Sequence, residues 1–176
     1  AAVVTWVMLQ AWRTEKPTAV GACIAAVVGL VAITPGAGFV TPMSAIAIGS
    51  IAAAVSYFAM QWMGRTRVDD ALDVFACHGL GGATGAILTG VFATTSINAG
   101  GANGLLAGNP GLLLAQLISV LVVAAYAAVA TAGILYVLKA VVGLRTSPEA
   151  EALGIDLVEH TEAAYAHEGG EGFLSR

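Results

Sequence analysis

The sequence predicts an all-α protein that crosses a membrane several times. Of its 176 residues, 58% are hydrophobic and only 10% are charged, and the mean hydropathy is +0.85. A soluble domain carries roughly 25% charged residues. Two long runs, residues 17–64 and 74–138, contain no Asp, Glu, Lys or Arg. Runs of this length hold several segments that can cross a bilayer as helices.

Five apolar segments are expected within a transmembrane region that covers residues 1–142. The segments are residues 1–12, 18–33, 43–63, 70–93 and 111–142. The first is too short to span alone and has the character of the second half of a longer span, so the chain is expected to be a piece of a larger protein. The fifth would be more than about 40 Å long, so it must tilt or project from the bilayer. Residues 143–176 are expected to form a polar tail.

The basic residues predict which connections face the cytoplasm. They occur after the first segment, after the third and at the end of the fifth, whereas the other two connections have none. If each segment crosses once, all of them lie on one side, which the positive-inside rule assigns to the cytoplasm of a cell membrane. The tail follows them to that side. The residues concerned are Arg13, Lys16, Arg65, Arg67, Lys139 and Arg145.

Charge and residue types also exclude several functions. The net charge of −4 comes from the tail, where seven acidic residues follow Gly143, so nothing indicates nucleic-acid binding. Cys23 and Cys77 lie in apolar runs and are expected to be core residues. No set of nucleophile, base and orienting group can be assembled, and no ligand spacing suggests a metal or cofactor. An enzyme is therefore not expected.

His78 is the residue that most clearly indicates function. It lies inside an apolar run of membrane-spanning length, where an ionisable side chain is costly unless it faces a partner, a cavity or a pore. At α-helical spacing it shares a face with Val74, Gly82, Gly85 and Thr89. The small residues on this face leave room for a lumen or another backbone. The alternative is a structural histidine, hydrogen-bonded between helices.

Asp70 and Asp73 precede this run and have two possible roles. With Asp70 at the N-cap and Asp73 at the third helical position, the pair resembles a capping box. The carboxylates also suit the positive end of the helix dipole. Alternatively, they attract cations at the mouth of a pore. The two roles can coexist.

Four motifs in order resemble those of the ammonium transporter (Amt/Mep/Rh) family. DDALDVFACHGLGG at residues 69–82 is similar to the signature of the tenth helix of that family. GLVAITPGAG at 29–38 and VGLR at 142–145 match the family's GLV-x-ITPAAG stretch and the sequence after its last helix. GID at 154–156 with EHTEAAY at 159–165 resembles the tail motif of the Amt branch.

The resemblance implies an eleven-helix fold of two inverted five-helix halves, assembled as a homotrimer. This chain would be the end of helix seven, helices eight to eleven and the cytoplasmic tail. The family conducts ammonium by deprotonating it and passing ammonia beside two hydrogen-bonded histidines. His78 matches the second histidine, Val74 a lumen position one turn earlier, and Asp73 the acid at the cytoplasmic end. The first histidine would lie in the part of the fold that precedes this chain.

The resemblance also implies a regulatory tail that docks on the cytoplasmic face and meets a PII-type nitrogen-signal protein. The matching positions are Gly143, Arg145, Gly154, Asp156, His160 and Tyr165. Thr161 stands where the motif has Gly, so the turn there is expected to differ. An ammonium sensor acting through a bound signal protein is the alternative function, and a channel for small neutral solutes is a third.

Overall fold

The computed structural model describes residues 1–14 and 16–162, which are helical apart from their connections. The chain divides into two compact units, Ala1–Tyr126 and Ala127–Arg176. Among the described residues, four helical segments are long and apolar enough to cross a membrane. These segments are Ala19–Gly36, Pro42–Met63, Phe75–Phe92 and Pro110–Val141. The sequence therefore folds as the all-helical, multi-span chain that its composition predicts.

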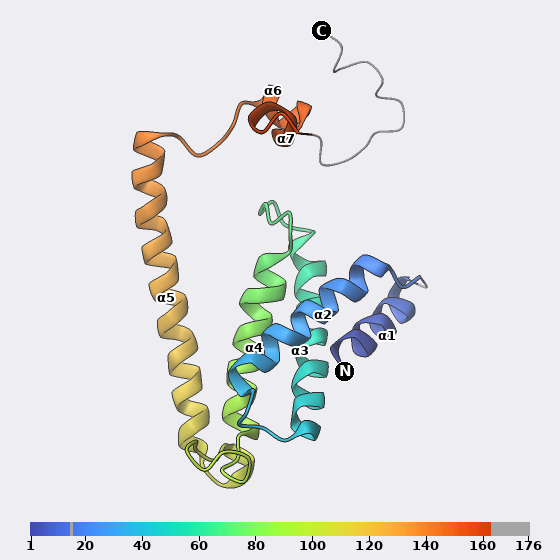
Figure 1. The fold of residues 1–176 in the computed structure, drawn as a ribbon, viewed down its shortest axis with the longest axis vertical. Coiled ribbons are helices and arrows are strands. Elements are labelled where there is room, and N and C mark those ends of the chain that lie inside the picture. Colours follow the sequence, from blue (N-terminus) through green and yellow to red (C-terminus); the bar gives the residue numbers. More distant parts are fainter. Residues whose placement is uncertain (15, 163–176) are drawn as a thin grey trace. The chain divides into compact units, whose positions relative to one another are not determined.

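The first unit is a bundle in which helices of neighbouring sequence pack together. Its elements are α1 (Ala2–Thr14), α2 (Ala19–Ile33), the 3-10 turn η1 (Thr34–Gly36), α3 (Pro42–Met63), the π-helix η2 (Phe75–Leu80), α4 (Gly81–Phe92), the 3-10 turn η3 (Leu105–Ala107) and the start of α5 (Pro110–Val141). α3 packs against α1, α2 and α4, and α2 also packs against α1 and α4 (Figure 1). α3 is thus the central helix of this unit.

Hydroxyl side chains cap the N-termini of two of these helices. Thr18 accepts a hydrogen bond from the backbone N–H of Gly21 at the start of α2, and Thr41 accepts one from Ser44 at the start of α3. Pro42 follows Thr41 as the first residue of α3, a position where its missing N–H is not needed. Both helices therefore begin where the sequence offers a capping residue before an apolar run.

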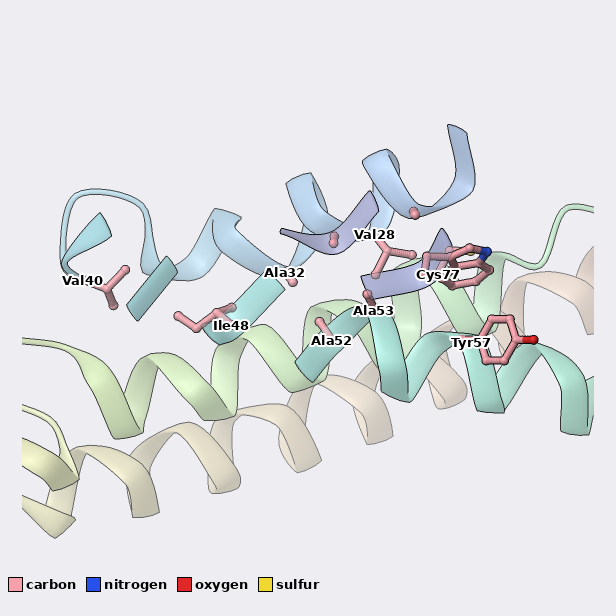
Figure 2. Close-up of a cluster of buried hydrophobic side chains, with 11 residues drawn as sticks. Val28, Ala32, Val40, Ile48, Ala52, Ala53, Tyr57 and Cys77 are labelled. Carbon is pink, nitrogen blue, oxygen red and sulfur yellow. The ribbon is translucent and has the colours of Figure 1, made fainter. Parts of the chain in front are cut away.

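The core of the first unit is a strip of small and branched side chains. It runs from Val40 at one end to Tyr57 and Cys77 at the other, with Ile48 and Val28 between (Figure 2). The other members are Ala2, Trp6, Ala25, Ala32, Ala52 and Ala53. Small residues allow helices to approach closely, which is how membrane bundles gain packing energy without a hydrophobic driving force.

Trp6 is the largest side chain in this core. It has no exposed surface, and its ring meets that of Tyr57 edge to face at a centroid distance of 5.1 Å. This geometry suits the quadrupoles of two aromatic rings. Trp12 and Trp62 are 75% and 61% exposed, as interfacial residues would be. Cys23 is exposed, contrary to the core position expected for it, whereas Cys77 is buried.

Gly85 marks a close approach between α2 and α4. A methyl group added at Gly85 would collide with the carbonyl oxygen of Ala32 and lie 2.7 Å from its carbonyl carbon. Backbone atoms of α2 cannot move aside as a flexible side chain could. Only glycine allows the two helices to cross at this distance.

The second unit contains the end of α5 and the tail. Gly143 has φ +84 and its N–H bonds to the carbonyl of Leu138, which ends α5 in the left-handed turn that glycine favours. Two short helices follow, α6 (Pro148–Leu153) and α7 (Ile155–Glu159), separated by Gly154 with φ +102. Ser147 caps α6 by accepting from the N–H of Ala150.

Thr161 adopts a backbone conformation that favours glycine. Thr161 has φ 55, in the left-handed region that β-branched residues rarely adopt. The expected difference from the turn of the family motif stays a prediction. The substitution is accommodated with backbone strain, in a turn where the N–H groups of His160 and Glu162 both bond to the carbonyl of Asp156.

Candidate functional site: His78 on a wide helical turn

The helix that carries His78 begins later than its sequence suggests. Residues 70–73 form a turn, and regular helix starts at Val74, four residues after the expected start at Asp70. The reason lies in Asp73, whose φ of 53 is left-handed and breaks the helical path. Aspartate tolerates this conformation better than most residues do.

Asp70 nevertheless caps this helix from outside it. Its carboxylate accepts hydrogen bonds from the backbone N–H groups of Val74 at 2.9 Å and Phe75 at 2.8 Å. Two of the N–H groups that a helix start leaves open are thereby satisfied by one negative charge. The capping box expected from the spacing is not formed in that register, because Asp73 precedes the helix.

Asp73 lies beside this capped turn. Its partial burial, and then the nearby negative charge of Asp70, raise the pKa of the Asp73 carboxyl above its ordinary value of 3.8. Its backbone carbonyl accepts the N–H of Cys77 at 2.9 Å, which links it to the first helical turn. Two carboxylates therefore meet at the end of the span, with different environments.

His78 lies in a π-helical segment, Phe75–Leu80, which continues directly into α4. π-helical turns are wider than α-helical ones, are rare, and often occur at functional sites. The backbone N–H of Gly81 bonds to the carbonyl of His78 where the wide turn ends. Within this turn Ala76 and Cys77 are buried, and His78 is exposed.

The wide turn changes the face that His78 was expected to share. Val74 and His78 are exposed, but Gly85 and Thr89 are buried against α2 and its end. The hydroxyl of Thr89 donates a hydrogen bond to the carbonyl of Gly85 in the same helix. The prediction of one continuous face is wrong, because the α-helical spacing it assumed does not hold through the π-helical residues.

The predicted tail residues that the structure describes lie in the second unit, where Arg145 forms an ion pair. The guanidinium of Arg145 forms hydrogen bonds of 3.1, 2.9 and 3.2 Å to both carboxylate oxygens of Glu151. Gly154 separates the two tail helices, Asp156 lies in the first turn of α7, and His160 ends it. Tyr165 lies outside the described residues. A forked arginine–carboxylate contact is the most specific geometry available to an ion pair.

Sequence reasoning missed two features of this site. One is the π-helical turn, whose available signal was the cluster of glycines around His78, Gly79, Gly81 and Gly82. The other is Ser56 of α3, which is fully buried and adjacent to Gly81. A serine within a long apolar helix gives no sign of its role in the sequence alone.

Comparison with known proteins places the chain in a family. The model of the Ammonium Transporter Family matches residues 1–165. The chain belongs to the ammonium transporter family. An ammonium transporter of Aquifex aeolicus is 48% identical over 165 residues, which cover 93% of this chain and 38% of that protein. The family consists of transporters and not enzymes, as the lack of a catalytic set predicts.

Solved ammonium transporter structures share the fold. Candida albicans Mep2 superimposes with a TM-score of 0.79 at 32% identity, over 90% of this chain and 36% of that one. A structure described as a sensor Amt protein gives a TM-score of 0.75 at 30% identity, over 90% and 38%. The chain thus corresponds to part of the Amt/Mep fold and spans about two fifths of the length of its curated relatives.

Proposed function

We propose that the protein containing this chain moves ammonium or ammonia across the cytoplasmic membrane. The observation that carries the proposal is His78. It is an exposed imidazole within the membrane-length segment Phe75–Phe92, in a chain of the ammonium transporter family. An ionisable side chain in that place is costly unless it faces a pore, a cavity or a partner group.

In this proposal His78 is one member of a hydrogen-bonded histidine pair that lines a narrow apolar pore. Val74 lies one turn earlier on the exposed side and would line the same lumen. A neutral imidazole can donate from one ring nitrogen and accept at the other, so it can bond both to a second imidazole and to ammonia. The other histidine of the pair would come from a part of the fold outside this chain.

Asp70 and Asp73 would lie at the cytoplasmic end of the pore. The capping bonds of Asp70 hold the first turn of the His78 helix. Asp73 makes the mouth more negative once its raised pKa is exceeded. A negative mouth attracts ammonium and other cations.

The proposed topology places the tail in the cytoplasm and the protein in a homotrimer. The basic residues of three connections support the orientation. A cytoplasm-specific reporter fused after Arg176 should therefore be active, and activity of a periplasm-specific reporter there would contradict the orientation. The tail residues from Gly143 to Tyr165 would form the regulatory surface and meet a PII-type signal protein.

The alternative is an ammonium sensor that signals through a bound partner. The similarity to a sensor Amt structure favours keeping this alternative, since transporters and that sensor share the fold. A channel for small neutral solutes such as water or carbon dioxide is the third possibility. Fold alone does not separate these functions.

Uptake measurements separate the three. The complete protein that carries this chain is expressed in cells without their own ammonium transporters, and uptake of labelled methylammonium is compared with water permeability. A transporter raises uptake and leaves water permeability near that of control cells. Raised water permeability without uptake favours the neutral-solute channel. If neither rises but a nitrogen response depends on the protein, the sensor is favoured.

A further inference from the structure

Ser56 is a buried polar residue to which the proposed function gives no role. It lies on α3 with no exposed surface, and its Oγ has no hydrogen-bond partner among the described residues. Thr89, also buried, donates to the carbonyl of Gly85. A buried hydroxyl without a partner destabilises a protein relative to an alanine of similar shape. Stability therefore does not explain a serine at this position.

The hydroxyl of Ser56 lies against the end of the wide turn that carries His78. A methyl group built on Gly81 would be 3.3 Å from Ser56 Oγ, 3.7 Å from Val28 Cγ1 and 4.0 Å from the carbonyl oxygen of Ala76. The space over the Gly81 Cα is thus occupied by the Ser56 hydroxyl. A backbone acceptor of the π-helical segment is in the same neighbourhood.

Gly81 connects this contact to His78. Its N–H bonds to the His78 carbonyl, so the position of Gly81 helps to set the main chain that bears the imidazole. A π-helical turn can shorten to an α-helical one when its hydrogen bonds shift from five residues to four. Such a shift would rotate His78 relative to Gly81 and to the buried residues Ala76 and Cys77.

We propose that Ser56 is a positioning residue for His78 and that it acts through Gly81. Its hydroxyl packs over Gly81 and so fixes, from α3, the point at which the wide turn ends. The turn is thereby kept π-helical, with His78 on the exposed side and Ala76 on the buried side. This inference depends on the role of His78 in transport proposed above.

The test is Ser56→Ala in the complete protein that carries this chain. Assembly and thermal stability should be unchanged or improved, because the orphan hydroxyl is removed. The maximal rate of methylammonium uptake should fall on the order of tenfold, because misplaced reacting groups lose rate steeply. The pH profile of uptake should also change, because the imidazole of His78 is displaced, whereas a general loosening of the bundle would not change it. Ser56→Cys, which keeps a γ atom over Gly81, should retain part of the rate that Ser56→Ala loses.

Ser50→Ala is the matched control, since Ser50 is half-buried on the same helix, six residues before Ser56. It should leave rate and pH profile unchanged. In a further pair, Gly81→Ala should disturb assembly less when Ser56 is already alanine, because the 3.3 Å contact is gone. The double variant should assemble but retain the lowered rate.

The outcomes separate this inference from the function on which it rests. If His78→Ala alters uptake while Ser56→Ala has the rate and pH profile of the unmodified protein, the positioning role of Ser56 is wrong and the pore role of His78 stands. If neither substitution alters uptake, the pore role is wrong as well. A double variant with a normal rate would also contradict the positioning role.

Discussion

At the scale of single residues, the start of the His78 helix depends on Asp70. The preceding turn would otherwise leave the N–H groups of Val74 and Phe75 open at a membrane surface, and one carboxylate satisfies both. Asp73 can then adopt its left-handed φ without loss of the cap. The two acids therefore have different duties, although the sequence presents them as a similar pair.

Asp70→Ala tests the capping duty. Loss of the two bonds should destabilise the protein by about 1–2 kcal/mol, the upper part of the range for lost helix caps. Thermal unfolding in detergent measures the effect as a lower Tm. Asp69→Ala is the control, because Asp69 is exposed and directly precedes this turn. Equal Tm values for the two variants would show that Asp70 does not cap.

Asp73 makes stability depend on pH in a direction that its pKa fixes. Burial and the charge of Asp70 raise the pKa of the folded-state carboxyl above 3.8, so the folded state holds this proton more tightly than the unfolded chain. The resulting stabilisation is complete below pH 3.8 and is lost as pH rises through the raised pKa. Asp73→Asn should match the unmodified protein at the acid end and become relatively more stable with rising pH. Parallel curves of Tm against pH would contradict the shift.

At the scale of helices, the crossing of α2 and α4 depends on Gly85. Gly85→Ala should destabilise the bundle by roughly 1–3 kcal/mol or more, because the methyl group collides with the Ala32 carbonyl. Gly82→Ala is the matched control three residues earlier. Its methyl group would meet Val31 Cγ1 at 3.5 Å, an ordinary contact. Yield and Tm of the assembled protein should fall for the first variant and hold for the second.

The tail is the element whose function is least dependent on membrane burial. The Arg145–Glu151 fork joins the segment before α6 to that helix, but the pair is exposed and contributes only about 0–1 kcal/mol. Apolar residues such as Leu144, Ile155 and Leu157 are also exposed, which suits a surface that docks elsewhere. We expect the tail to act by docking and not by stabilising the bundle.

Deletion of the tail from Gly143 onward should therefore leave membrane insertion intact. It should alter uptake, or the inhibition of uptake by a PII-type signal protein, because the docking surface is removed. Labelled methylammonium uptake with and without the signal protein measures both. Unchanged uptake together with unchanged inhibition would exclude the regulatory role.

At the scale of the whole molecule, the sequence predicts the helical architecture well. Long apolar runs give most helix positions within a few residues: the expected segments 18–33, 43–63 and 111–142 correspond to Ala19–Ile33, Pro42–Met63 and Pro110–Val141. The fourth helix is the exception. Its start depends on a left-handed Asp73, and no propensity identifies that one residue among three acids in five positions.

The site is only partly predictable, for a related reason. His78 can be identified because an imidazole within a membrane-spanning run is expensive, whatever the local geometry. The face on which His78 lies cannot be predicted, because the π-helical turn packs against α2 and α3, and these helices are distant from it in the sequence. Ser56 belongs to the same class: its contact with Gly81 exists only in the folded bundle.

The most direct test of the whole account is uptake by the His78→Ala variant of the complete protein, with His160→Ala as the matched histidine control. Both proteins are first shown to assemble and to reach the membrane in equal amounts. The account predicts that His78→Ala changes the rate of labelled methylammonium uptake, or its selectivity over potassium, whereas His160→Ala keeps the transport selectivity of the unmodified protein. Unmodified rate and selectivity in a correctly assembled His78→Ala protein would contradict the account.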